Sequence, residues 1–159
     1  MMNWAHVHLM INHIPVIGIF GALLLFVYAL LKKSEELKMV SLGIFVLIAL
    51  IMIPVFFTGE AAENVVKKIP GVTETYIGRH EEFAEYSITV MEILGTVCLL
   101  CLYFIFKSGT VPKWLLTIVL LLALLTAAVV GLTANLGGQI RHTEIREGAS
   151  YAPALTPGK

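Results

Sequence analysis

The chain carries five histidines, at positions 6, 8, 13, 80 and 142, and no other residue type in it points as directly to chemistry. Neutral imidazole is the commonest metal ligand among protein side chains. His8 and His13 are five residues apart, so on one helix they point about 140° apart and lie about 7.5 Å apart along its axis. One metal ion would hardly take both. The spacing suits two sites, or one ligand and one supporting residue.

Four apolar stretches must position these histidines, near residues 9–31, 39–57, 87–106 and 114–136. A bilayer core about 30 Å thick requires about 20 apolar residues in a helix. With 58% hydrophobic and 14% charged residues, the composition is that of a membrane protein. We predict an all-α membrane protein, a four-transmembrane-helix up-down bundle whose helices extend beyond the bilayer on the outer side. Pro15 is expected to kink the first helix by removing its bond to Ile11.

The predicted transmembrane domain covers residues 1–147, with helices at about 3–33, 38–68, 74–107 and 112–143. Residues 148–159, with several Pro and Gly, are predicted to form an extended C-terminal tail. Short connections favour antiparallel neighbours in the bundle. The two short turns carry lysines, whereas the opposite side is richer in glutamate. By the positive-inside rule, the short turns are cytoplasmic and both termini lie outside.

Heights along the helices bring histidines from three helices into one outer layer. At about 1.5 Å per residue, His13 lies about 28 Å above the basic turns, and His8, His80 and His142 lie about 36, 40 and 44 Å above them. These four histidines are the predicted ligands of a metal or of haem b, one or two haems per chain. Haem would be held non-covalently, because the sequence has no Cys-x-x-Cys-His motif. The alternative is that histidines simply tolerate the membrane interface.

Other residues near this layer are candidates for supporting roles. Arg79 and Arg141 are expected to pair with haem propionates, or else with surface glutamates. Gly138 allows close approach of a cofactor or of another helix. Met10 shares a helix face with His13 and is a candidate soft ligand, although methionine on a helix is usually a packing residue.

Glu92 is the acidic residue placed deepest in an apolar stretch, about 22 Å above the basic end of its helix. An ionisable residue at such a depth is a functional hypothesis by default. Two interpretations stay open. One is a proton relay or quinone site, and the other is a structural hydrogen bond to Thr126, Thr133 or Asn135.

Four short motifs resemble a family of uncharacterised bacterial four-helix membrane proteins. They are His8-Leu9-Met10-Ile11-Asn12-His13-Ile14-Pro15, Thr58-Gly59-Glu60-Ala61-Ala62, His80, and Gly137-Gly138-Gln139-Ile140-Arg141-His142. The interval between the glycine pair and the closing histidine is shorter here than in the family. Relatives of this family are sometimes fused to Rieske iron-sulfur domains. The resemblance therefore implies electron transfer, with an architecture similar to that of membrane b-type cytochromes.

These observations predict a b-type cytochrome of the bacterial inner membrane, with its haem near the periplasmic face. It would act as an electron-transfer protein or subunit rather than as a stand-alone enzyme. Expected partners are the lipid bilayer, other redox subunits or periplasmic electron carriers, and quinone. Nucleic acid is not expected, because the net charge is zero. The alternatives are an accessory subunit without a cofactor, or a carboxylate-histidine site for zinc, copper or di-iron, although the Glu-x-x-His pairs of di-iron proteins are missing.

Overall fold

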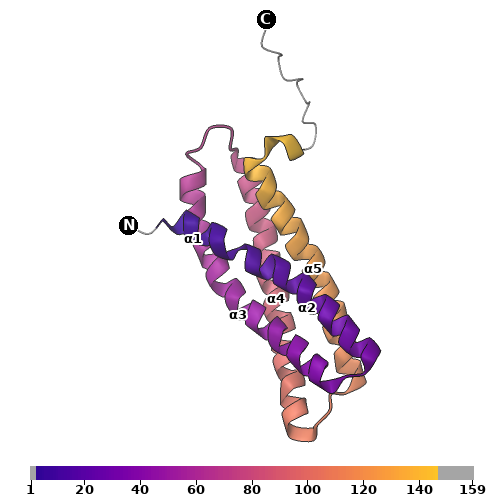
Figure 1. The fold of residues 1–159 in the computed structure, drawn as a ribbon. Helices are drawn as coiled ribbons and strands as arrows, with labels where there is room; N and C mark the ends of the chain where they lie inside the picture. Colours follow the sequence, from indigo (N-terminus) through magenta and orange to yellow (C-terminus); the bar gives the residue numbers. More distant parts are fainter. Residues whose placement is uncertain (1–2, 147–159) are drawn as a thin grey trace, which may run out of the picture.

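The computed structural model describes residues 3–146 and confirms the all-α bundle. Figure 1 shows an elongated bundle in which neighbouring helices run antiparallel. The described helices are α1 (Trp4–Ile11), α2 (His13–Lys32), α3 (Glu35–Val66), α4 (Glu74–Ser108), α5 (Lys113–Arg141) and the short 3₁₀ helix η1 (Thr143–Ile145). With α1 and α2 taken together, residues 3–146 contain 4 helical runs long and apolar enough to cross a membrane. The predicted tail, residues 148–159, lies outside the described residues.

Tight turns at one end of the bundle produce the up-down order. Lys33 ends α2 in the left-handed region with φ 52°, and the Ser34 side chain caps α3 by accepting a hydrogen bond from the Leu37 amide. Gly109 ends α4 with φ 76°, a conformation that glycine adopts at little cost. The longer connection between α3 and α4 lies at the other end (Figure 1).

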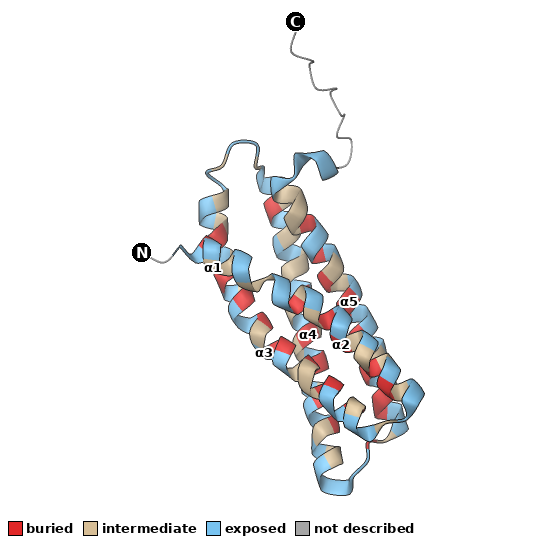
Figure 2. Cartoon of the chain, in the orientation of Figure 1, coloured by how far each residue is buried: buried red, intermediate tan, exposed pale blue. Residues whose placement is uncertain are grey.

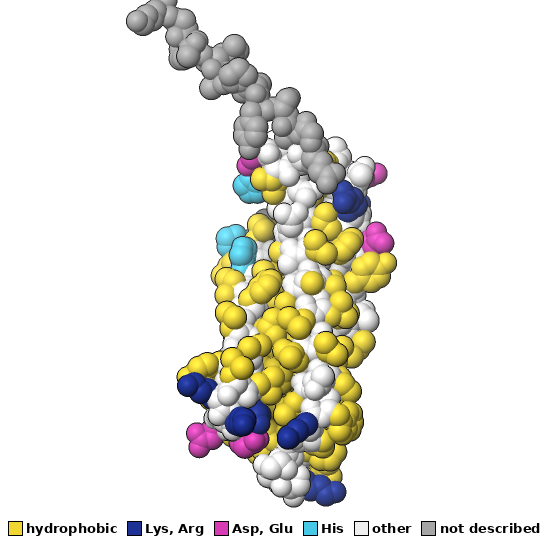
Figure 3. All heavy atoms as spheres, turned by 90° about the vertical axis from the view of Figure 1, so that its right-hand side faces the viewer, with side chains coloured by type: hydrophobic (Ala, Val, Ile, Leu, Met, Phe, Trp, Pro, Cys, Tyr) yellow, Lys and Arg dark blue, Asp and Glu magenta, His cyan; other side chains and the backbone are white. Residues whose placement is uncertain are grey.

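The helices α2, α3, α4 and α5 form a ring, in which α2 packs on α3 and α5, and α4 packs on the same two. Figure 2 shows buried residues recurring along each of the long helices, with exposed residues between them. Phe26, Phe45, Met91, Leu94 and Val119 are fully buried there. Apolar side chains also cover the outside of the helices, and Figure 3 shows them over the middle of one face, with Lys and Arg gathered near its lower end. The outside therefore matches a lipid environment.

The first apolar run is divided at Asn12, where α1 ends and α2 begins. Pro15 has no backbone N–H, so the carbonyl of Ile11 has no partner four residues later. The helix is thus interrupted close to Pro15, where a kink was expected, although the run was predicted as one helix over 3–33. After the break, α1 packs on α3, while α2 packs on both α3 and α5.

Arg146 ties the end of the described chain to the α3–α4 connection. Its guanidinium donates to the carbonyls of Gln139, Ile140 and Gly71 at 2.8, 3.0 and 3.2 Å. It also lies over the Tyr76 ring, 4.3 Å from the centroid. These contacts close the outer end of the bundle.

Candidate cofactor site

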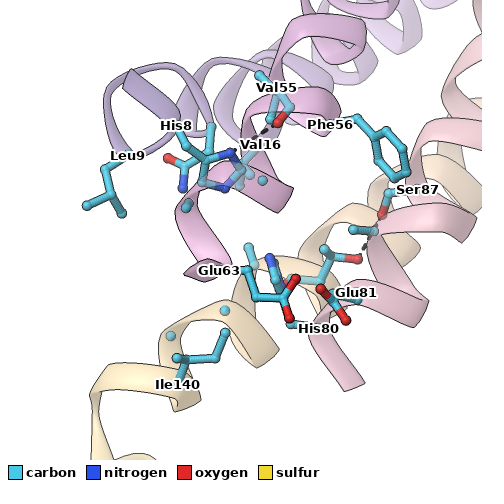
Figure 4. Close-up of a pocket in the computed structure, with 18 of the residues that line it drawn as sticks. His8, Leu9, Val16, Val55, Phe56, Glu63, His80, Glu81, Ser87 and Ile140 are labelled. Carbon is cyan, nitrogen blue, oxygen red and sulfur yellow. Dashed lines mark hydrogen bonds between the residues drawn. The ribbon is translucent and has the colours of Figure 1, made fainter. Parts of the chain in front are cut away.

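A cavity of about 640 Å³ opens at the end of the bundle opposite the two short turns, between α1, the start of α2, α3, α4 and α5. Its volume lies within the range typical of small-molecule and cofactor sites. The lining is mainly apolar, and its polar members come from every one of these helices. They include His8, Asn12, His13, Glu63, His80, Glu81, Thr133, Arg141 and His142. Figure 4 shows His8 and His80 directed into this space from different helices.

His8 projects from α1 and is held by α3. Its Nδ1 lies 3.0 Å from the carbonyl oxygen of Val55 and 3.2 Å from the hydroxyl of Thr58. The Thr58 hydroxyl donates to the carbonyls of Pro54 and Val55, at 2.8 and 2.9 Å, so its oxygen is free to accept from the ring. The His8 ring is therefore fixed by two groups that lie within one turn of α3.

His80 projects from α4 and is held by α5 in the same way. Its Nδ1 lies 3.0 Å from the carbonyl oxygen of Thr133. The Thr133 hydroxyl makes a 2.8 Å hydrogen bond with that of Ser87 and donates to the carbonyl of Phe83 at 2.9 Å. This network joins α4 to α5 directly beside the ring.

A glycine lies under each ring, four residues after the carbonyl that holds it. A Cβ on Gly59 would lie 3.5 Å from Cε1 of His8, and a Cβ on Gly137 would lie 3.1 Å from Cε1 of His80. On a helix, the side chain of residue i+4 leans toward residue i and covers its carbonyl. Glycine at 59 and 137 leaves the carbonyls of Val55 and Thr133 open to a side chain from another helix.

The carbonyl partners also decide which nitrogen of each ring carries the proton. A carbonyl oxygen only accepts, so Nδ1 of both His8 and His80 must donate. In the neutral ring Nε2 then keeps its lone pair. No hydrogen bond among the described residues uses Nε2 of either ring. Each ring therefore has the form of a metal-ligating histidine, with one nitrogen anchored and the other open to the cavity.

Carboxyl groups lie at the mouth of the cavity beside the histidines. Figure 4 shows Glu63 of α3 and Glu81 of α4 pointing toward each other. Glu63 also pairs with Lys67, one turn later. This hydrogen bond from Lys67 to Glu63 and the nearby glutamates raise the pKa of Lys67, which lies just beyond the end of α3. The mouth is thus acidic, with one lysine bound to it.

Asn12, at the break between α1 and α2, has a buried Oδ1 with no hydrogen-bond partner among the described residues. Asn12 lines the same cavity as His8 and His80. A buried amide oxygen without a donor is costly. The cavity therefore offers one further polar group that a bound molecule would satisfy.

The other histidines are placed differently from His8 and His80. The side chain of His13 is exposed, and its Nδ1 bonds to the Leu9 carbonyl of its own helix at 3.2 Å. His142 is exposed and pairs with Glu144 at 2.8 Å. Hydrogen bonds from the backbone N–H of Glu144 and from His142 lower the pKa of Glu144. His13 and His142 line the cavity mouth without an anchor on another helix.

The predicted supporting residues also divide into two groups. Arg141 is exposed but lines the cavity, whereas Arg79 is exposed and does not line it. Gly138 lines the cavity, as predicted for a site residue. A Cβ on it would meet Ile145 of η1 at 3.3 Å, whereas a Cβ on Gly137 would meet His80. Met10, the candidate soft ligand, is 66% exposed and does not line the cavity.

Glu92 makes none of the side-chain hydrogen bonds that the sequence suggested. Its Oε1 is buried without a partner among the described residues. Thr126 instead donates to the carbonyl of Leu122, and Asn135 accepts from Gln139. The interpretation of Glu92 as a partner of Thr126, Thr133 or Asn135 is therefore wrong, because those groups are satisfied on their own helix or by their nearest neighbours.

Sequence reasoning missed the carbonyls of Val55 and Thr133 and attached no role to Gly59. A backbone carbonyl accepts a hydrogen bond whatever its side chain is, so the sequence does not mark such a partner. The feature that could have indicated the two carbonyls is a glycine near the end of α3 and another near the end of α5, each at a height similar to that of a histidine on another helix. Within residues 3–146, no group of three or more His, Cys, Asp or Glu side chains is placed to hold a metal ion. This finding does not bear on a site with two histidine ligands.

The site's geometry stands without support from relatives. The chain matches no protein-family model, no curated protein and no solved structure.

Proposed function

We propose that the chain is a membrane b-type cytochrome whose haem is held between His8 and His80. The single observation that carries this proposal is the shared anchoring of the two rings. Each Nδ1 donates to a backbone carbonyl of a neighbouring helix, and each Nε2 is open to the same cavity. Such an outer hydrogen bond is the usual companion of a metal-ligating histidine, because it orients the ring and makes Nε2 more basic.

Three further features of the cavity fit a haem group. A largely apolar lining suits a flat porphyrin, and the volume of about 640 Å³ is sufficient for a cofactor. Arg141 at the mouth is a suitable partner for a propionate. His8 and His80 would hold the haem, which would supply one-electron transfer by taking an electron from a donor and giving it to an acceptor. Two anchored histidines support one haem rather than the two that remained open from the sequence.

The same proposal includes an orientation and partners. Lys and Arg gather near the end of the bundle that carries the short turns, as Figure 3 shows, and the positive-inside rule favours the cytoplasmic side for that end. The cavity would then face the periplasm of a bacterial inner membrane, with both termini on that side. Its electrons would come from or pass to quinone, periplasmic carriers or other redox subunits.

The experiment is an absorption spectrum of the purified protein after expression with added haem precursor. We expect a Soret band and, after dithionite reduction, a sharp α band. His8→Ala and His80→Ala should each abolish the low-spin spectrum. His6→Ala and His142→Ala are matched controls, since both histidines are exposed at the same end, and both variants should keep it.

His13→Ala tests whether His13 differs in its role from His8, which lies in the same apolar run. The His13 ring is held only by its own helix, so this variant should also keep the low-spin spectrum. Protein that folds but shows no Soret band would overturn the proposal. Bound zinc, copper or iron without porphyrin would favour a metal site in the same cavity. Unchanged assembly of a complex after loss of both His8 and His80 would favour a cofactor-free accessory subunit.

A further inference from the structure

Two helices carry the same set of exposed side chains at the end of the bundle that has the short turns. On α2 and again on α4, a leucine is followed four, seven and eight residues later by a tyrosine, a large apolar residue and a lysine. At about 100° per residue, each set lies within about 100° of the helix circumference, and we call the two sets the α2 stripe and the α4 stripe. They consist of Leu24, Tyr28, Leu31 and Lys32 on α2, and of Leu99, Tyr103, Phe106 and Lys107 on α4, all exposed.

Each stripe changes from apolar to cationic along its helix. Lys32 is the last residue of α2, and Lys107 is the last residue but one of α4. At about 1.5 Å per residue, the tyrosine lies about 6 Å and the leucine about 12 Å deeper in the bilayer than the lysine. An apolar surface that ends in a tyrosine and a lysine matches the boundary between hydrocarbon and headgroups. A molecule that covers a whole stripe must therefore be apolar along its length and anionic at one end.

In both stripes the lysine is held against its tyrosine. The Lys32 Nζ lies 5.7 Å from the centroid of the Tyr28 ring, and the Lys107 Nζ lies 5.5 Å from that of Tyr103. A helical side chain leans toward the N-terminus of its helix, so at these C-terminal ends it leans toward the bilayer. Neither lysine forms an ion pair with a described residue. Each ammonium is therefore positioned beside the hydrocarbon with hydrogen-bond donors left for an anion.

The other lysines at this end of the bundle are placed differently. Lys38 is buried and pairs with Glu35 at 2.7 Å. Lys33 follows the α2 stripe and forms the turn, with φ 52°. Lys113 begins α5, where leaning toward the N-terminus directs a side chain away from the bilayer. Neither Lys33 nor Lys113 lies over an aromatic ring of a described residue. The tyrosine–lysine arrangement is thus confined to the two stripes.

We propose that each stripe is a binding site for an anionic phospholipid, such as phosphatidylglycerol. The headgroup phosphate accepts hydrogen bonds from the lysine ammonium and the tyrosine hydroxyl, and an acyl chain lies along the apolar members of the stripe. A hydrogen bond from an ammonium to a phosphate is charge-assisted and about twice as strong as one between neutral groups. A zwitterionic phospholipid brings a positive charge of its own close to the lysine, so the site favours a lipid with a net negative charge.

The arrangement of the stripes favours a lipid over a soluble anion and predicts two separate sites. A soluble phosphate can use the lysine and the tyrosine but leaves the apolar part of the stripe uncovered. Among the described residues α2 and α4 make no contact with each other, so each stripe takes its own lipid. The inference does not depend on haem binding.

The test is native mass spectrometry of the full chain in detergent, with phosphatidylglycerol and phosphatidylcholine of identical acyl chains. We expect two phosphatidylglycerol molecules per chain to bind with about fivefold higher affinity than phosphatidylcholine, as expected for one lysine near each headgroup. Lys32→Gln and Lys107→Gln should each remove one of these sites. Lys33→Gln is the matched control, because it removes the same charge one residue beyond the α2 stripe, and it should keep both sites.

Two further measurements test the parts of the site separately. Tyr28→Phe removes only a hydroxyl and should weaken the α2 site while the α4 site keeps its native affinity. Glycerol phosphate has the headgroup chemistry without the acyl chains and should not displace phosphatidylglycerol at equal concentration. Equal affinity for the two lipids, a loss in Lys33→Gln as large as in Lys32→Gln, native binding in Tyr28→Phe, or displacement by glycerol phosphate would each overturn the proposal.

Discussion

Replacing Gly137 with alanine tests the anchoring of His80 with the smallest possible change. The added Cβ would lie 3.1 Å from Cε1 and 3.2 Å from Nδ1 of the His80 ring. Carbon atoms pack best at about 3.5 to 4.0 Å, so the ring must move by about 0.4 Å. The hydrogen bond from Nδ1 to the Thr133 carbonyl, now 3.0 Å, would lengthen toward about 3.4 Å, where such bonds are weak.

The expected result is a selective loss of haem affinity. Disturbing the outer partner of a metal ligand typically costs about 10- to 100-fold in affinity. We expect about tenfold for Gly137→Ala, which corresponds to about 1.4 kcal/mol. Alanine is a better helix former than glycine by about 0.5 to 1 kcal/mol. Thermal unfolding of the haem-free protein should therefore show no loss of stability.

The assay is titration of the haem-free protein with haemin, followed by the Soret band. Gly59→Ala is the matched control, because its Cβ would lie 3.5 Å from the His8 ring, an ordinary contact. Nitrogen NMR of the His80 side chain tests the same geometry without haem, since Nδ1 should lose its hydrogen bond in Gly137→Ala. Native affinity in Gly137→Ala, or an equal loss in Gly59→Ala, would refute the reasoning.

Two other contacts lead to predictions about stability and exposure. Gly95→Val should separate α3 from α4 and destabilise the fold by about 1 to 3 kcal/mol, because even a Cβ there would lie 2.6 Å from that of Ala49. Unfolding in SDS measures this loss of stability. Gly43→Val is the control and should have a milder effect, because nothing lies within 4 Å of a Cβ at that position. Arg146→Gln should release the α3–α4 connection by removing three hydrogen bonds and the contact with Tyr76. Limited proteolysis should therefore cut this connection faster in the variant than in the native protein. An unchanged rate of cleavage would show that these contacts do not hold the connection.

The arrangement of the helices could be predicted because it depends on features that are local in the sequence. Apolar length, basic short turns and helix-breaking residues indicated four spans in up-down order, and the structure has them. The separation of His8 and His13 also followed from helical geometry. Five residues apart on a helix, the two histidines were expected to face different neighbours, and His8 of α1 bonds to α3 while His13, after the break at Asn12, is exposed.

The identity of the anchored pair could not be predicted, because it depends on contacts between helices. His80 and His142 have similar heights, yet one bonds to the Thr133 carbonyl and the other to a surface glutamate. Height along a helix carries no information about rotation around it when neither side chain lies in a clear apolar stripe. The glycine pair shows the same limit, since Gly137 rather than Gly138 faces a histidine.

The cavity opens where the first apolar run changes its neighbours, at the break at Asn12. Among the described residues α1 contacts α3 and α2 but not α5, whereas α2 contacts both α3 and α5. Residues of α1 and of α5 both line the cavity, so it occupies the end of the bundle where these two helices make no contact. Pro15, which also lines it, costs the first helix the hydrogen bond to the Ile11 carbonyl. The break, the missing contact and the unpartnered oxygen of Asn12 therefore fall at one place, which a bound molecule would fill.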